Sequence, residues 1–228
     1  MHRRTAVTAT SALALATLEA CNASYAPPIR GTHYGLPGRL SSGQGEVAVA
    51  AAGPHNRGSA TVALPLARGL TVEGNYDGAE RFHIGSAGLR GTIPLGGPWS
   101  LDLEGGLGAG VGGERCGNSS DTTQTCAAGQ ADGRSAYDRF AFGGYLGAGV
   151  GLRPWRLVGF FVRARTQVSS ATGAPVTGWG SAVAGVEFRA GPVRPYLAGG
   201  AFVMLNDAHT ESNAILELGL SVPFTLWR

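Results

Sequence analysis

Residues 216–228 read LELGLSVPFTLWR, a stretch in which apolar side chains alternate with small or polar ones. Successive side chains of a β-strand point to opposite faces, so this period of two predicts a strand with one apolar face. The apolar face carries Leu216, Leu218, Leu220, Val222, Phe224 and Leu226. The other face carries Glu217, Gly219, Ser221 and Thr225. Chain ends usually fray unless something holds them, and we therefore expect this strand to be paired along its length.

The same period of two runs through most of the chain from Gln44 onward, and no stretch has a convincing helical period. Strand-like runs cover about 44–52, 58–66, 69–77, 82–93, 99–111, 139–152, 157–168, 177–190, 193–205 and 213–226. These ten runs predict an all-β domain over residues 44–228.

The connections between the runs alternate in length. Short, Pro-rich turns follow the even-numbered runs, and longer polar loops follow the odd-numbered ones, including the long segment 112–138. Short turns at one end, longer loops at the other and an even strand number are typical of outer-membrane barrels. We therefore predict a closed antiparallel transmembrane β-barrel of about ten strands, with eight as the alternative. A soluble sandwich has no reason to sort its loops in this way.

The composition narrows the possible functions. Charged residues are 14% of the chain, below the roughly 25% of typical soluble domains. All 18 basic residues are arginine, so a lysine nucleophile or Schiff base is excluded. Without residues 1–20, the arginines fall from 18 to 16 and the acids from 15 to 14, a net charge of about +2. That balance does not suggest a nucleic-acid partner.

Charged residues on the polar face predict ion pairs inside the barrel. Asp102 and Glu104 share this face of one run, and Arg163 and Arg165 share it two runs later. The run between them has glycines on this face at 143, 147, 149 and 151, and such small residues would let the acids reach the arginines. Arginine binds carboxylates in a bidentate fork. We expect a narrow lumen closed by these pairs; the alternative is the solvated outer face of a soluble barrel.

The final strand resembles a known signal. ELGLSVPF, Glu217 to Phe224, is similar to the C-terminal insertion signal of bacterial outer-membrane proteins, although the chain continues to Trp227 and Arg228. The resemblance implies a bacterial outer-membrane β-barrel protein, surrounded by outer-membrane lipid and recognised by the barrel-insertion machinery. The last strand would then pair with the run at 44–52 and leave no open edge in lipid.

The N-terminal residues indicate export. Residues 1–20 have a basic start and a short apolar stretch, which predicts a signal peptide. The following LEAC, Leu18 to Cys21, resembles a bacterial lipobox and implies that Cys21 receives lipid; ordinary cleavage nearby, for example after Ala23, is the alternative. Residues 21–43 are rich in Pro, Gly and Ser without a period, and we interpret them as an exported N-terminal linker. Cys116 and Cys126 lie in one polar loop and can form a disulfide in an oxidising compartment.

No motif predicts a catalytic, metal or cofactor site. His55, His83 and His209 fall at the longer-loop end, where solvated loop histidines are expected rather than metal ligands. Asp207-x-His209, with Asp77 in another outer loop, faintly resembles the rim of the omptin proteases, but no matching aspartate pair is present. Tryptophans 99, 155 and 227 all fall at the short-turn end, as an interfacial girdle would.

The sequence therefore predicts a protein that is not an enzyme. We expect an outer-membrane barrel with a structural, surface-exposed or envelope-complex role, whose outer loops meet envelope protein partners. A narrow channel for small solutes is the alternative, and a hydrolase at the outer rim is a third possibility. Near-balanced charge on the polar face favours closure, because selective pores usually carry an excess of one sign.

Overall fold

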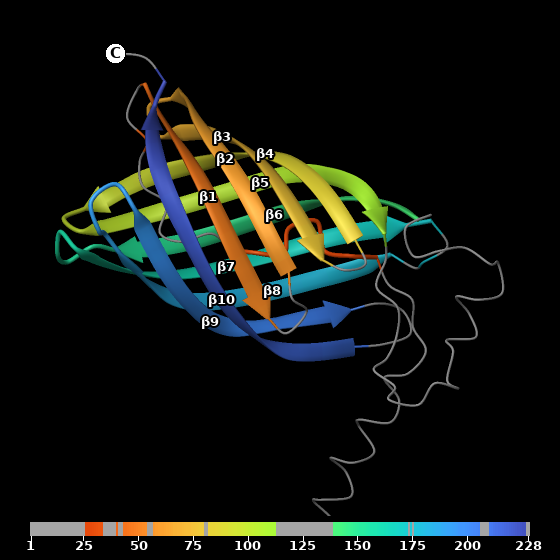
Figure 1. Cartoon of the computed structure of the whole chain (residues 1–228). Helices are drawn as coiled ribbons and strands as arrows, with labels where there is room; N and C mark the ends of the chain where they lie inside the picture. The colour runs from red at the N-terminus through yellow and green to blue at the C-terminus, as the bar shows by residue number, and fades with distance from the viewer. Residues whose placement is uncertain are drawn as a thin grey trace, which may run out of the picture.

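The computed structural model describes residues 26–33, 40, 43–53, 57–79, 82–112, 139–172, 174, 176–205 and 210–226. Ten antiparallel strands form one closed barrel, in which each strand pairs with its neighbours in the sequence (Figure 1). The prediction of ten strands is confirmed, and the eight-strand alternative is wrong. The strands are β1 (Gln44–Gly53), β2 (Arg57–Ala67), β3 (Leu70–Ala79), β4 (Phe82–Gly96), β5 (Trp99–Gly112), β6 (Phe140–Leu152), β7 (Val158–Ala171), β8 (Thr177–Phe188), β9 (Arg194–Leu205) and β10 (Thr210–Thr225).

The barrel closes where β1 meets β10. The pairing runs in register from Gln44 opposite Thr225 to Gly53 opposite Leu216. Figure 1 shows the two strands side by side, in orange and dark blue. The expected pairing of the last strand with the first is therefore confirmed, and it satisfies the backbone groups of both terminal strands.

The two ends of the barrel differ. At the short-turn end, the connections are residues 68–69, 97–98, 153–157 and 189–193. Gly69 in the first of these turns has a φ of 78°, a left-handed conformation that glycine adopts at little cost. The remaining connections lie at the opposite end, called here the long-loop end, and the longest of them joins β5 to β6.

The outer surface is apolar and the interior is polar. Leu107, Leu146 and Leu216 point outward with 74%, 67% and 63% of their surface exposed, whereas inward-pointing Asp102 is 1% exposed. Burial against water would produce the opposite arrangement, so the outer surface is suited to lipid. The exposed Trp99 adds an aromatic side chain at the short-turn end. Among the described residues, no helix is long and apolar enough to cross a membrane.

One expected loop residue is instead part of the wall. Asp77 lies within β3, and its side chain is fully buried inside the barrel. The expectation that it belongs to an outer loop is wrong, because β3 continues in register with β4 as far as Ala79 opposite Phe82. The strand thus carries an additional carboxylate into the lumen.

Residues 26–33, called here the lumen segment, lie inside the barrel (Figure 1, red). Its N-terminal residue, Ala26, contacts Thr177 and Ser169 near the long-loop end. Gly43, which immediately precedes β1, lies at the other end, where its carbonyl accepts a hydrogen bond from the Leu226 amide. This part of the expected linker 21–43 is therefore enclosed by the barrel, and it runs from the long-loop end toward the short-turn end.

Candidate functional site

A ladder of inward side chains on β7 binds the carbonyl groups of the lumen segment. Arg163 donates to the carbonyl of His33 at 2.7 Å, and Arg165 donates to that of Thr32 at 2.6 Å. Further along β7, the Gln167 amide donates to the Arg30 carbonyl at 2.9 Å and the Ser169 hydroxyl to the Ala26 carbonyl at 3.3 Å. The donors are two residues apart because alternate strand residues face the lumen. They cover six residues of rise, roughly 20 Å.

The amide groups of the segment are bound by acceptors from other strands. The Gly31 amide donates to Asp77 Oδ1 on β3 at 3.1 Å. The His33 amide donates to Glu217 Oε2 on β10 at 2.8 Å. The Arg30 amide donates to Gln167 Oε1 at 2.8 Å, so Gln167 binds both main-chain groups of that residue. The wall thus offers donors on β7 and carboxylates on β3 and β10, which matches the two sides of an extended peptide.

The Arg30 side chain joins two carboxylates across the lumen. Its Nη1 lies 2.8 Å from Glu73 Oε2 on β3 and 3.6 Å from Glu104 Oε2 on β5. The guanidinium also stands over the Tyr145 ring, 5.6 Å from the ring centroid. Arg30 is 1% exposed, so its charge depends on these partners for stabilisation.

Glycines on the wall make room for Ile29. A Cβ atom added at Gly108 would lie 2.6 Å from Ile29 Cγ2, and one added at Gly143 would lie 2.9 Å from Ile29 Cγ1. Ile29 is fully buried in an apolar cluster with Phe82, Ile84, Tyr145 and other residues. The small residues of β5 and β6 therefore form a slot for one branched side chain.

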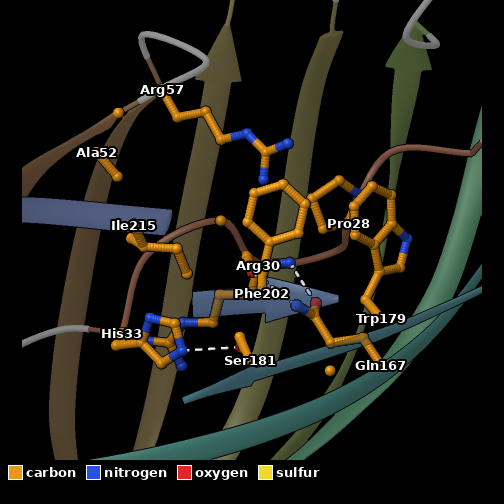
Figure 2. A pocket seen from close by; sticks show the side chains of 13 residues that line it. Pro28, Arg30, His33, Ala52, Arg57, Gln167, Trp179, Ser181, Phe202 and Ile215 are labelled. Atoms are coloured by element: carbon orange, nitrogen blue, oxygen red, sulfur yellow. Dashed lines mark hydrogen bonds between the residues drawn. The ribbon is translucent and has the colours of Figure 1, made fainter. Parts of the chain in front are cut away.

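A small cavity remains beside the segment (Figure 2). It has a volume of about 30 Å³ and is lined by Arg30, His33 and residues of the wall. His33 Nε2 lies 2.8 Å from Ser181 Oγ, and Gln167 approaches Arg30, as the dashed lines show. The Arg57 guanidinium lies 5.5 to 6.0 Å from the centroids of three aromatic rings. A void of this volume holds one or two water molecules and is too small for a hydrated ion path.

The four residues expected to form lumen ion pairs all lie inside the barrel. Glu104 contacts both arginines, with Arg163 Nη2 at 3.2 Å and Arg165 Nη2 at 2.7 Å. The glycines of β6 lie between them, since Gly147 pairs with both Glu104 and Arg165. Asp102 is placed differently: it accepts a hydrogen bond from Thr92 Oγ1 on β4 at 2.7 Å.

These wall contacts follow the circumference of the barrel. Glu104 and its arginines are two strands apart, and Arg90 on β4 contacts Glu73 on neighbouring β3 at 2.8 Å. Near-neighbour pairs of this kind lie against the wall and leave the centre to be filled by something else. In this protein the lumen segment occupies that centre.

Several predicted sites lie outside the described residues. These are the proposed lipidation site Cys21, the proposed disulfide Cys116–Cys126, His55, and the Asp207-x-His209 stretch. His83 is described: it points outward on β4, where Nδ1 lies 2.5 Å from the Tyr76 hydroxyl. Within the described ranges, no group of three or more His, Cys, Asp or Glu side chains could hold a metal ion.

The role of the lumen segment in the site was not predicted from its sequence. The segment has no strand period, and the wall binds mainly its peptide groups, which are common to all sequences. Three of its residues offered a signal that could have been used. Arg30 is a charge within an otherwise apolar and small stretch, and Pro27 and Pro28 favour an extended chain.

Comparisons with known proteins give likenesses at the level of the fold. No protein-family model matches the chain, and no curated protein matches it. One similar solved structure is titled "KdgM porin", with a TM-score of 0.36 and 7% identity over 78% of this chain and 99% of that one. A second, "KdgM porin in complex with disordered oligogalacturonate", has the same TM-score and identity over 79% and 99%. A third, OpdQ of Pseudomonas aeruginosa, has a TM-score of 0.25 and 12% identity over 75% and 57%.

Proposed function

We propose that this protein is a bacterial outer-membrane β-barrel that acts as a narrow, normally closed channel for small solutes, with residues 26–33 as its gate. The observation that carries the proposal is the way the wall holds the segment. At least eight hydrogen bonds join wall side chains to its main-chain groups. Water can replace polar bonds of this kind when the segment leaves, and the lumen left behind is lined by charged and polar groups.

The docking of the segment depends on many individually weak contacts. Each of the four bonds from charged wall side chains contributes about 1.5–3 kcal/mol, and each of the four from neutral ones about 0.5–1.5 kcal/mol. The ion pairs of Arg30 and the burial of Ile29 add to docking, while ordering the backbone opposes it by roughly 1–2 kcal/mol per residue. Removing one or two of these contacts should therefore shift the docking equilibrium of the segment.

The width of the barrel is consistent with a solute path through the lumen once residues 26–33 have left it. Eight-stranded barrels are just wide enough for side chains to fill, whereas barrels of sixteen to eighteen strands leave an aqueous channel. Ten strands leave room for one extended peptide in addition to the side chains of the wall. A path of that width would admit small solutes and exclude folded proteins. We propose no catalytic role for the lumen.

Single-channel recording of the purified full chain in planar bilayers tests the proposal. Wild type should be closed for most of the time. Gln167→Leu removes the bonds to both the amide and the carbonyl of Arg30 without changing charge, and this variant should open more often. Heat-dependent gel mobility verifies that each variant is a folded barrel.

A reversible disulfide between the segment and the wall makes the test specific to the segment. Thr32 Oγ1 lies 2.6 Å from Ser59 Oγ on β2, so cysteines at both positions, in a Gln167→Leu chain without the native cysteines, are placed to form a disulfide. Oxidation should abolish the openings and a reductant should restore them. Openings that are equally frequent in both states would refute the gate.

A folded barrel that stays silent in every variant, including a deletion of residues 26–33, would overturn the channel. It would favour the rival role, a structural or envelope-complex barrel whose loops bind other proteins. The closed lumen is the observation in favour of that rival.

A further inference from the structure

We propose that the vacated lumen is a binding site for short, extended peptides that carry an arginine, and that such peptides are the class of solute the channel recognises. This inference rests on the channel proposed above and names its substrate class. Its basis is that the wall already binds one peptide of this kind, residues 26–33, through contacts that any chain of the same pattern could make.

The first contribution to peptide binding does not depend on the sequence of the peptide. Arg163, Arg165, Gln167 and Ser169 donate to carbonyl groups, while Asp77 and Glu217 accept from amides. A simple ion cannot pair with both sets, and the hydroxyl groups of a sugar, although they donate and accept, do not repeat with the spacing of an extended peptide. The spacing along β7 therefore selects a peptide backbone in an extended conformation.

The second contribution selects a cation at one position. Glu73 and Glu104 both approach the Arg30 guanidinium, and the Tyr145 ring lies against it. Each carboxylate also contacts arginines of the wall, so this sub-site is preformed before a peptide arrives. Arginine suits it better than lysine, because a planar fork can reach two carboxylates and stack on a ring at once.

The third contribution selects the residue before the arginine. Ile29 occupies the slot that Gly108 and Gly143 leave open. Pro28 precedes it, and proline reduces the conformational freedom that a peptide loses on binding. A Cβ atom added at Gly31 would lie 3.2 Å from Arg57 Cδ, so a small residue suits the next position. The pattern recognised by the lumen is therefore proline, a branched apolar residue, arginine and a small residue, all in an extended chain.

The segment normally prevents other peptides from binding. Because it is covalently attached, its effective concentration at the site is on the order of millimolar. A free peptide therefore gains access only when the segment is absent or weakened. This competition makes the site testable with a peptide of the segment's own sequence.

The experiment measures binding and block separately. A fluorescent, end-capped peptide of sequence APPIRGTH is titrated into the chain that lacks residues 26–33, in detergent, and its anisotropy is recorded. The same peptide is then added to that variant in planar bilayers. If the deletion variant does not fold, the full-length Arg30→Ala/His33→Ala chain, in which the segment is weakened, replaces it in both assays.

We expect saturable binding and concentration-dependent block. The peptide APPIAGTH should bind about 30- to 150-fold more weakly, since it lacks the charge-assisted bonds of the arginine. Glu73→Gln in the barrel should weaken APPIRGTH more than APPIAGTH, because only the former contacts that carboxylate. A neutral oligosaccharide of similar length should neither bind nor block.

Two results would overturn the inference: a vacated, folded barrel that does not bind APPIRGTH, or equal affinity for the two peptides. Either result is compatible with steady conductance, which would leave the proposed channel standing. Binding with the expected preference in a barrel that never conducts would instead remove the channel and keep the peptide site.

Discussion

Replacing Arg30 by alanine should loosen the gate without breaking the wall. Arg30 Nη1 lies 2.8 Å from Glu73 and 3.6 Å from Glu104, and charge-assisted bonds of this kind contribute about 1.5–3 kcal/mol each. The longer contact should contribute less. Both carboxylates keep other partners, because Glu73 retains Arg90 and Glu104 retains Arg163 and Arg165. No buried charge is left alone, so we expect the lumen segment to lose about 2–3 kcal/mol of docking free energy.

This loss corresponds to a roughly 30- to 150-fold shift in the docking equilibrium, since about 1.4 kcal/mol is tenfold. Two assays detect it. The open probability of single channels should rise by that factor while it remains small, and hydrogen exchange at the amides of Gly31 and His33 should accelerate by a similar factor. Both amides are bonded to wall carboxylates in the closed state.

Arg153→Ala is a matched control. Arg153 contacts Glu187 at 3.3 Å at the short-turn end, and Glu187 keeps Arg189 nearby at 3.8 Å. The substitution also removes one arginine from a shared carboxylate, at a place without a described contact to residues 26–33. It should leave the open probability within about twofold of wild type, less than the effect of one ordinary hydrogen bond. A folded Arg30→Ala barrel with unchanged opening and unchanged exchange would refute the role of Arg30 in holding the segment.

Further predictions concern the wall, the long loop and the N-terminal cysteine. Glu104→Gln should destabilise the barrel by about 3–5 kcal/mol in urea or heat titrations, because the buried Arg163 and Arg165 lose their shared carboxylate. Asp102→Asn should have a clearly smaller effect, and equal effects of the two substitutions would contradict this account. Cys116 and Cys126 should be unreactive to thiol labels in denatured, unreduced protein, and their disulfide should stabilise the loop by about 2–3 kcal/mol; two free thiols would refute the pairing. Cys21 should incorporate labelled fatty acid, which Cys21→Ser should abolish. Because five peptide steps span at most roughly 18 Å, a lipid on Cys21 should be found on the long-loop side of the membrane, where Ala26 lies.

The strands and their orientation could be predicted because they depend on local periodicity. Each strand alternates lipid-facing and lumen-facing residues, and β5 shows why this is readable: Leu103 and Leu107 are exposed, whereas Asp102 and Glu104 between and beside them are buried. The length difference between the two sets of connections then identified a barrel rather than a sandwich. Neither inference required knowledge of contacts between distant residues.

The boundary of β3 shows where local signals fail. The sequence YDGAER contains an Asp-Gly pair, which usually marks a turn. In the structure the strand continues through this pair, and Asp77 binds the Gly31 amide, 46 residues away in the sequence. A contact at that separation overrides the local preference for a turn, and nothing near Asp77 in the sequence predicts the contact.

The lumen segment was missed for a related reason. A strand that faces lipid on one side and a lumen on the other needs alternating apolar and polar residues. A peptide bound on all sides by polar side chains does not need this alternation. Its partners are spread over β3, β5, β7, β8 and β10, and most of them bind peptide groups rather than side chains. Recognition of this kind leaves almost no trace in the sequence of the bound segment.

The way the lumen is closed also differs from the simplest interpretation of its charges. The near-balanced charge on the polar face suggested that pairing alone would close the barrel. The pairs between wall residues run between strands one or two apart, as Glu73–Arg90 and Glu104–Arg165 do. Such pairs neutralise the wall and leave its centre free. Closure requires a group that reaches several strands at once, and Arg30 and His33 of the lumen segment do so by contacting β3, β5, β8 and β10. A balanced wall can therefore line either a closed barrel or an open one, and in the proposed mechanism the position of residues 26–33 decides between them.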